Sequence, residues 1–319
     1  MLETLKSRQK TGGTMPYTVA VSRDGSRYLW GGGSPDRPCP LFVFDTKTNK
    51  QLFELIDLDC PALNASFLPD GGVVAAGWNS QLCVWSAQGE LLANNGVDRE
   101  GRFEAFALSG DAQYALIGGS QGEIAGWRLS EMEQVLSFKD NSKGHEIQSM
   151  AMHPSALVLV SGRRDGVIRV WDLQAKKRLR HIELGVGNHI KGLAWHPDGK
   201  RFLAAVAPDG AADGDSSRGV LFDAATGQQL NVFDTQKCQP FCCAISPDGA
   251  QIAIAGGGTD NEGSEKKKNC VIHFWETGSG HRLEQLKGHS AHVRRIAFSP
   301  DSRWLLSTAW DETVRCWAL

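Results

Sequence analysis

The sequence predicts an all-β fold, and the stretch from Gly288 to Trp317 carries the pattern that predicts it. Three short segments there, 293–298, 304–308 and 313–317, are apolar or alternate between apolar and polar residues, and turn-forming residues separate them. One such unit cannot bury both of its faces alone, so it has to stack against copies of itself. The fold therefore depends on whether the chain contains further copies.

Seven copies of this unit run along the chain. The aromatic residue that ends the third segment recurs at intervals of about 40 to 50 residues, close to the length of a four-stranded propeller blade. A turn of the Ser-Pro-Asp-Gly type repeats with it, as at 246–249, where Pro presets φ and Gly accepts a positive φ. The sequence therefore predicts a seven-bladed β-propeller of four-stranded antiparallel blades. The seven aromatic residues are Phe44, Trp85, Trp127, Trp171, Phe222, Trp275 and Trp317.

The two ends of the chain are predicted to share the last blade. The last copy stops after its third strand, and residues 2–6 resemble residues 283–287, which precede the last Gly-His pair. We therefore predict that residues 2–6 form the outer strand of blade seven and close the ring, which removes an exposed pair of sheet edges. The whole chain, 1–319, then forms one propeller domain.

The remaining blades follow in order, and three of them carry enlarged connections. Blades one to four are predicted at about 17–52, 58–94, 103–138 and 145–183. Blades five and six contain Gly-rich and charged insertions at 207–218 and 256–269, and blade one has an enlarged connection at 31–40. The insertions of blades five and six fall between the second and third strands, so we expect surface loops there.

The repeats resemble the WD-repeat β-propeller family over nearly the whole chain. The likeness is closest from Gly144-His145 to Trp171-Asp172 and from Gly288-His289 to Trp317. It implies that connections between second and third strands lie on the same face of the ring as those preceding the inner strands, which is called the top face. The enlarged connections of blades one, five and six are then expected on that face.

Two blades repeat a set of residues that looks like a catalytic triad with an added indole. In the family that they resemble, such residues form a structural hydrogen-bond relay that satisfies buried polar groups. An identical set in two blades also favours a structural role, because an enzyme needs one site. Blades two and three have Asn79 and Gln121 at the Asp position and lack the His, so we expect incomplete relays and lower local stability there. The two complete sets are His145, Ser161, Asp165 and Trp171 in blade four, and His289, Ser307, Asp311 and Trp317 in blade seven.

The composition argues against several classes of function. A net charge of −2 and a pI of about 6.5 provide no overall basic field of the kind that drives nucleic-acid binding. No stretch approaches the roughly 20 apolar residues of a membrane span, and the N-terminus has no apolar signal region. The eight cysteines include no CxxC pair and no zinc-like spacing with His. We expect reduced core thiols, no metal and a cytoplasmic location.

Two positions of the repeat supply the candidate binding residues, because partner-binding residues of similar propellers often occupy them. Trp, Tyr and Arg, which recur at these positions, are enriched at interface hot spots. The first position lies in the inner strand and holds Tyr17, Leu63, Glu104, Gln148, Lys191, Phe241 and Arg294. The second lies just before the Asp-like turn position and includes Trp78, Arg164 and Trp310.

These residues lead us to expect a non-catalytic scaffold that binds a peptide or partner-protein segment across the top face, within a multi-subunit complex and without a cofactor. The aromatic residues would bury apolar groups, and Arg164, Lys191 and Arg294 would pair with acidic or backbone acceptors. The alternative is a small-ligand-binding or metal-binding propeller, with or without enzymatic activity, at the channel mouth. Among the inner-strand residues, Glu104 is the one carboxylate available for it. Direct nucleic-acid binding is a third reading and predicts a steep salt dependence. No membrane partner is expected.

Overall fold

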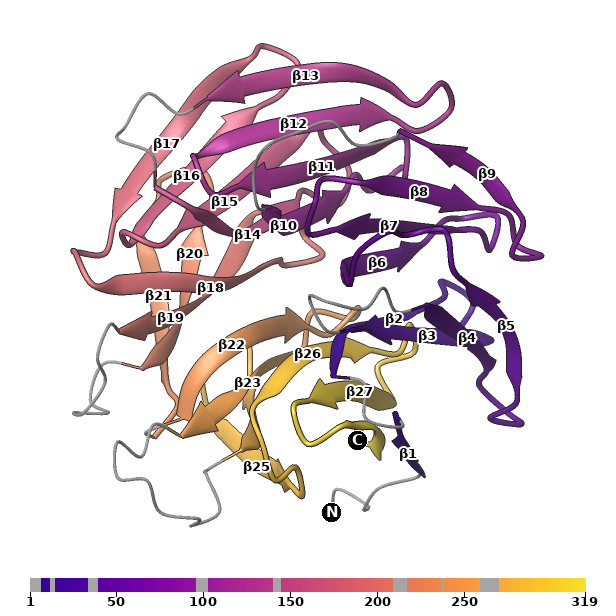
Figure 1. Cartoon of the computed structure of the whole chain (residues 1–319). Coiled ribbons are helices and arrows are strands. Elements are labelled where there is room, and N and C mark those ends of the chain that lie inside the picture. Colours follow the sequence, from indigo (N-terminus) through magenta and orange to yellow (C-terminus); the bar gives the residue numbers. More distant parts are fainter. Residues whose placement is uncertain are drawn as a thin grey trace.

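The computed structural model describes residues 7–11, 15–33, 40–95, 103–139, 145–208, 217–236, 238–258 and 270–319. Within these ranges the regular elements are strands, and they form seven four-stranded antiparallel sheets arranged as blades around a ring (Figure 1). The predicted all-β, seven-bladed propeller is therefore confirmed.

Six blades use consecutive strands, with the first strand innermost and the fourth outermost. Blade one contains β2 (Pro16–Val21), β3 (Arg27–Gly32), β4 (Leu41–Asp45) and β5 (Gln51–Leu55). Blade two contains β6 (Ala62–Phe67), β7 (Val73–Gly77), β8 (Leu82–Trp85) and β9 (Leu91–Asn94). Blade three contains β10 (Phe103–Leu108), β11 (Tyr114–Gly119), β12 (Glu123–Arg128) and β13 (Glu133–Lys139).

The second half of the ring repeats this order. Blade four contains β14 (Ile147–Met152), β15 (Val158–Arg163), β16 (Val167–Asp172) and β17 (Lys177–Glu183). Blade five contains β18 (Asn188–Trp195), β19 (Arg201–Pro208), β20 (Arg218–Asp223) and β21 (Gln229–Asp234). Blade six contains β22 (Cys238–Ile245), β23 (Gln251–Gly258), β24 (Val271–Glu276) and β25 (Arg282–Lys287).

Blade seven joins the two ends of the chain. Its inner three strands are β26 (Val293–Phe298), β27 (Trp304–Ala309) and β28 (Thr313–Ala318). The outer strand is β1 (Ser7–Lys10), which pairs with β28 from Ser7↔Cys316 to Lys10↔Thr313 and lies beside the C-terminus in Figure 1. Closure by an N-terminal strand is therefore confirmed. The strand that forms it is 7–10, and the predicted residues 2–6 lie outside the described residues.

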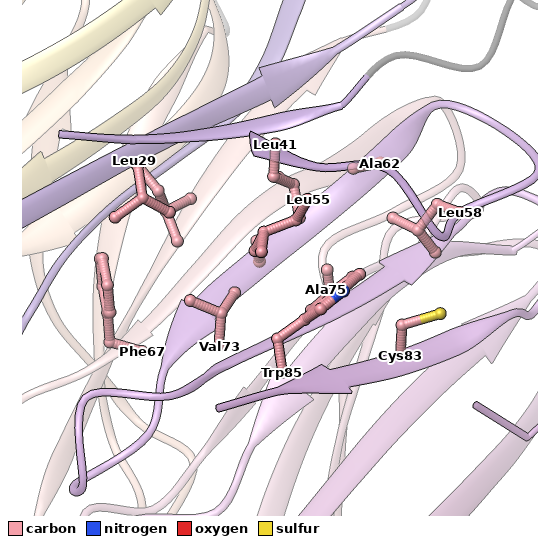
Figure 2. Close-up of a cluster of buried hydrophobic side chains, with 12 residues drawn as sticks. Leu29, Leu41, Leu55, Leu58, Ala62, Phe67, Val73, Ala75, Cys83 and Trp85 are labelled. Atoms are coloured by element: carbon pink, nitrogen blue, oxygen red, sulfur yellow. The ribbon is translucent and has the colours of Figure 1, made fainter. Parts of the chain in front are cut away.

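The core lies between the blades, because each sheet is apolar on both faces. Each of seven buried clusters joins two neighbouring blades. The cluster between blades one and two packs Leu29 and Leu41 against Val73, Ala75 and Trp85 (Figure 2). Closing the ring therefore adds one more interface than an open row of seven blades would have.

The enlarged connections lie where the sequence predicts them. In blades five and six, the second strands β19 and β23 end at Pro208 and Gly258, and the third strands begin at Arg218 and Val271. Most residues of these connections lie outside the described ranges. The inner hairpins leading to them are longer than in the other blades, with strands of 8 residues.

Candidate binding site at the channel mouth

Each inner strand contains a β-bulge at the residue that the repeat pattern predicts as a candidate. In β26, for example, the register with β27 shifts between Val293 and Arg295, which makes Arg294 the extra residue. A bulge interrupts the alternation of side chains and re-aims the extra one. Because the inner strands surround the channel, every blade directs one side chain to its mouth. The bulged residues are Tyr17, Leu63, Glu104, Gln148, Lys191, Phe241 and Arg294, which we call the mouth ring.

The whole mouth ring lines one cavity of about 110 Å³. Trp78, from the turn after β7, and Arg295 complete its lining. This volume holds a few water molecules or one group the size of a side chain, since a water molecule occupies about 30 Å³ of liquid. Residues far apart in the sequence are thus brought to a single site.

One side of the mouth ring is aromatic and surrounds the guanidinium group of Arg294. Its central carbon lies 5.1 Å from the ring centroid of Phe241, 5.2 Å from that of Trp310 and 5.9 Å from that of Tyr17. These distances are within the roughly 6 Å range of cation–π attraction. Trp78 extends the aromatic surface, with its ring centroid 5.4 Å from that of Tyr17. Burial, reinforced by a neighbouring guanidinium, lowers the pKa of Arg294 from its ordinary value.

The side formed by blades three to five is charged. Arg164 Nη1 lies 3.6 Å from an oxygen of Glu146. Burial acts to raise the pKa of Glu146, but a hydrogen bond with Glu104 and the charges of Lys191 and Arg164 outweigh it, so this pKa lies below its ordinary value. Burial lowers the pKa of Lys191, while the two carboxyl groups oppose the shift. Acidic and basic groups here compensate one another.

Two polar atoms of the mouth ring lack a hydrogen-bond partner among the described residues. They are Nε of Arg294 and Oε1 of Gln148, and both are buried. A buried polar atom without a partner costs about 1–3 kcal/mol. A bound group that supplied an acceptor to the first and a donor to the second would remove that cost.

Exposed apolar side chains gather on the face that contains the mouth. Trp310 is 37% exposed and lies in the turn between β27 and β28. Val186 is 96% exposed and Ile56 is 69% exposed, and each lies between the outer strand of one blade and the inner strand of the next. Together with Met15, these are the large exposed hydrophobic residues that lie outside outer strands in the described part of the chain. All four belong to top-face connections.

Two further residues at this site share a position in the repeat. Glu146 and His292 each immediately precede an inner strand. Their carbonyl oxygens accept hydrogen bonds of 3.0 Å from the backbone N–H groups of Arg164 and Trp310 respectively. The His292 ring packs 5.0 Å from Trp310. In blades four and seven, the residue before the inner strand is thus a further repeat position that contributes to the mouth.

The predicted relay in blade seven is fully hydrogen-bonded. Trp317 Nε1 donates to Ser307 Oγ at 2.8 Å, Ser307 Oγ lies 2.7 Å from His289 Nε2, and His289 Nδ1 lies 2.9 Å from Asp311 Oδ2. For a neutral imidazole, the Ser307 hydroxyl donates to Nε2 and Nδ1–H donates to the Asp311 carboxylate. Thr313 and the backbone N–H of Ser290 also donate to Asp311. Burial opposes these bonds, but they hold the pKa of Asp311 well below its ordinary range.

The relay in blade four differs from this pattern. Trp171 Nε1 donates to Ser161 Oγ at 2.9 Å, but His145 is substantially exposed and its Nε2 lies 3.6 Å from Asp165. The carboxylate instead accepts from the buried guanidinium of Arg163, with Nε to Oδ1 at 3.0 Å. Blade seven has Ala309 at the position of Arg163, and the guanidinium beside its Asp311 is that of Arg315, whose Nη2 lies 3.7 Å from Oδ2.

In blade two, the indole N–H of the tryptophan has a different hydrogen-bond acceptor. Its position equivalent to Ser307 is Ala75, which has no hydroxyl. The Trp85 indole donates instead to Asp57 Oδ2 at 2.6 Å, and Cys60 Sγ donates to Asn79 at 2.9 Å. The shared His–Ser–Asp set is thus replaced here by a local network.

Comparison with known proteins agrees with this architecture. The family model described as "WD domain, G-beta repeat" matches residues 133–172 and 280–318. Each match combines the outer strand of one blade with the three inner strands of the next, and each contains one of the two relays. The chain is a WD-repeat β-propeller.

Similar relatives of this WD-repeat propeller include three plant proteins. "Cell division cycle 20.1, cofactor of APC complex" from Arabidopsis thaliana is 26% identical over 310 residues, covering 94% of this chain and 60% of the relative. "Protein FIZZY-RELATED 1" from the same plant is 25% identical over 304 residues, covering 82% and 61%. A "guanine nucleotide-binding protein subunit beta" from Zea mays is 23% identical over 320 residues, covering 95% and 77%. The chain therefore spans less than two thirds of the first two relatives.

The predicted partner-binding residues of this propeller lie together. Tyr17, Trp78, Glu104, Lys191, Phe241 and Arg294 line the cavity, Trp310 contacts Arg294, and Arg164 reaches the site through Glu146. Among the described residues, no three His, Cys, Asp or Glu side chains form a group that suits a metal ion. In the same residues, no helix has the length and apolar character to cross a membrane.

Proposed function

We propose that this WD-repeat propeller is a non-catalytic scaffold that binds a peptide or protein segment across its top face. The observation that carries the proposal is the mouth ring, since seven bulges in seven blades direct their side chains into one cavity. A ring of seven packed sheets is rigid, so little of the protein has to be ordered on binding.

The chemistry of the site supports a polypeptide ligand. A small side chain fits the cavity of about 110 Å³, where Arg294 and Gln148 each have a buried polar atom that a ligand can pair. Around it, Trp310 and Val186 offer exposed apolar surface for the flanking residues. Aromatic and Arg residues at the centre with apolar contacts around them match the make-up of interface hot spots.

The relatives support protein partners in general. One is by name a cofactor of a complex, and another is a subunit of a guanine nucleotide-binding protein. We infer that this chain also acts within a protein assembly, and a cytoplasmic location remains a prediction.

A small-molecule ligand at the same mouth is the alternative, and the concave cavity favours it. Glu104 and Glu146 could offer two carboxyl groups to such a ligand. These two groups already hydrogen-bond to each other, and both interact with the charge of Lys191. A metal-binding version is tested by measuring metal in the purified protein. Stoichiometric, tightly held metal would replace the scaffold proposal.

The scaffold proposal is tested by affinity capture from the native source. Three proteins serve as separate baits: the wild-type chain, the double variant Trp310→Ala with Arg294→Ala, and the single variant Val186→Asp. Leu230→Ala is the matched control, because Leu230 is also exposed but lies on outer strand β21. Proteins captured by the wild type and the control, and lost with both top-face variants, support the proposal.

Circular dichroism confirms that each bait is folded. Because Arg294 packs on three aromatic rings, its replacement could disturb the local structure. The capture results of the double variant are therefore interpreted together with those of Val186→Asp, which disturbs no buried contact. Equal capture by all baits would place binding elsewhere on the ring and refute the proposed site.

A further inference from the structure

A second cavity, away from the mouth ring, lies between the outer parts of blades three and four. Its volume is about 240 Å³, and we call it the blade three–four groove. Its apolar lining comes from Leu136 and Phe138 of β13 and from Trp171 and Leu173 of blade four. The Phe138 and Trp171 rings lie 4.9 Å apart, and the indole N–H is fixed to Ser161. The groove therefore presents a fixed, partly buried aromatic floor.

The rim of the blade three–four groove is basic. Lys139, Lys176 and Lys177 are exposed there, and Asp172 is the carboxylate on the same lining. One oxygen of Asp172 accepts a backbone hydrogen bond from Ala175 at 2.8 Å. The rim thus has a net positive charge next to an apolar cavity.

The basic character continues along the outer strand of blade four. In β17, Arg178 is exposed and faces the same side of the sheet as Trp171, its partner in the register. Its neighbour Arg180 donates to the carbonyl of Ala225 in blade five, so that cation is engaged. Glu183, the carboxylate at the end of the strand, pairs with His181 at 2.7 Å.

Edge protection alone does not account for this charge. Lysines on an outer strand discourage edge-to-edge pairing of sheets. The outer strands of blades one, two and five contain no Lys or Arg, although they are equally outermost. Among the outer strands, β17 contains the most Lys and Arg residues, three against two each in β25 and β1, and it borders the groove that has an aromatic floor.

We propose that the blade three–four groove binds an acidic segment of a partner protein. One apolar side chain of the segment fills the cavity against Phe138 and Trp171, and flanking Asp or Glu residues pair with the rim lysines. The segment lies along the groove rather than adding a fifth strand, because a bulge at Leu179 interrupts the edge of β17. This site is independent of the proposed top-face function.

The test uses a displayed library of random peptides selected on the purified full chain. Selected peptides are then measured for Kd on the wild type, on Lys176→Glu with Lys177→Glu, and on Lys200→Glu with Lys287→Glu. The last variant is the matched control, because it reverses two exposed lysines on other blades and changes the net charge equally. We expect acidic peptides with an apolar residue whose Kd rises about tenfold or more on the first variant and changes less than about twofold on the control.

A substitution in the peptide tests the groove on the wild-type protein, so its result does not depend on whether a protein variant folds. Replacing its apolar residue with Ser is expected to weaken binding to the wild type about tenfold. Peptides that bind at the mouth ring instead are identified by their affinities, because Trp310→Ala weakens their binding and Lys176→Glu with Lys177→Glu does not. The proposal is overturned if no selected acidic peptide discriminates between the two lysine variants, or if all such peptides lose affinity equally on both.

Discussion

At the scale of single residues, the seven repeats are similar in sequence but differ in how their buried polar groups are satisfied. In blade seven one hydroxyl, Ser307, bonds both the Trp317 indole and the His289 ring. In blade four the equivalent Ser161 bonds the indole, while Asp165 is held by Arg163. The same residue type at the same repeat position therefore supports different numbers of bonds.

This difference predicts unequal effects of one substitution in two blades. Ser307→Ala leaves two buried groups without their partner, so we expect the free energy of unfolding to fall by about 2–4 kcal/mol. Ser161→Ala removes the partner of one indole and is expected to cost about half as much. Urea denaturation of the two variants measures both values. A larger loss for Ser161→Ala would contradict the relay geometry.

A buried histidine in blade six predicts how stability depends on pH. His273 is buried in β24, and its Nδ1 accepts a hydrogen bond from Arg282 at 2.6 Å. Burial, with the charge of Arg282, lowers its pKa from 6.5 to about 4. Between these values the unfolded chain binds the proton and the folded protein does not, so stability falls as the pH drops from about 6.5 to about 4.

Replacing this histidine is expected to flatten that part of the stability profile. The contribution of His273 to the loss over this window is about 3 kcal/mol, and His273→Gln removes it. Phe274→Leu is the control, because it weakens the neighbouring core without removing a titrating group, and its curve should shift down at every pH. Urea denaturation from pH 4 to 7 measures the curves. An unchanged slope in His273→Gln would contradict the assignment.

At the scale of elements, the strand that closes the ring is short. β1 has 4 residues, and its pairing with β28 is extended by two hydrogen bonds from Thr11 to the carbonyl of Glu312. Without it, β28 becomes an outer strand with unpaired backbone groups, and such edges associate with other chains.

Deleting residues 1–11 is therefore expected to lower the melting temperature and cause concentration-dependent association. Gln9→Pro in the full chain is the companion variant, because proline removes the N–H at the register position opposite Val314 without shortening the chain. Deleting residues 1–6 separately tests whether the predicted strand 2–6 contributes. Thermal melts and light scattering at several concentrations follow the outcome. A monomeric 1–11 deletion with wild-type stability would show that β1 is dispensable.

The elements were predictable from the sequence because their signals are local and periodic. The aromatic at the end of the third strand marks every blade, an Asp-Gly turn marks four of the seven, and the three inner strands of blade seven are predicted to within a residue. The residues of the mouth ring could be predicted because they share a position in the repeat. That their side chains meet in one cavity depends on the β-bulges, and these have no common residue type, as the difference between Tyr17 and Lys191 shows. The capture of Asp165 by Arg163 was not predictable, since it is a competition between two partners in space.

At the scale of the whole molecule, closure couples the blades to one another. Every blade packs against two neighbours, and blade one packs against blade seven through Trp30, Phe44 and Leu306. A terminal repeat of an open array can separate by breaking one interface, but here a blade has to break two. We therefore expect the ring to unfold as one unit.

A cavity in a single interface tests this expectation. Leu41 is fully buried between blades one and two, so Leu41→Ala should lower the free energy of unfolding by about 2–5 kcal/mol. If the ring unfolds as one unit, circular dichroism and tryptophan fluorescence will report the same midpoint, because the tryptophans are spread over all blades but the destabilised interface is only one. Leu230→Ala, at an exposed outer-strand position, should change stability by less than about 0.5 kcal/mol. Two separate transitions in Leu41→Ala would show that blades one and two open while the rest of the ring stays folded.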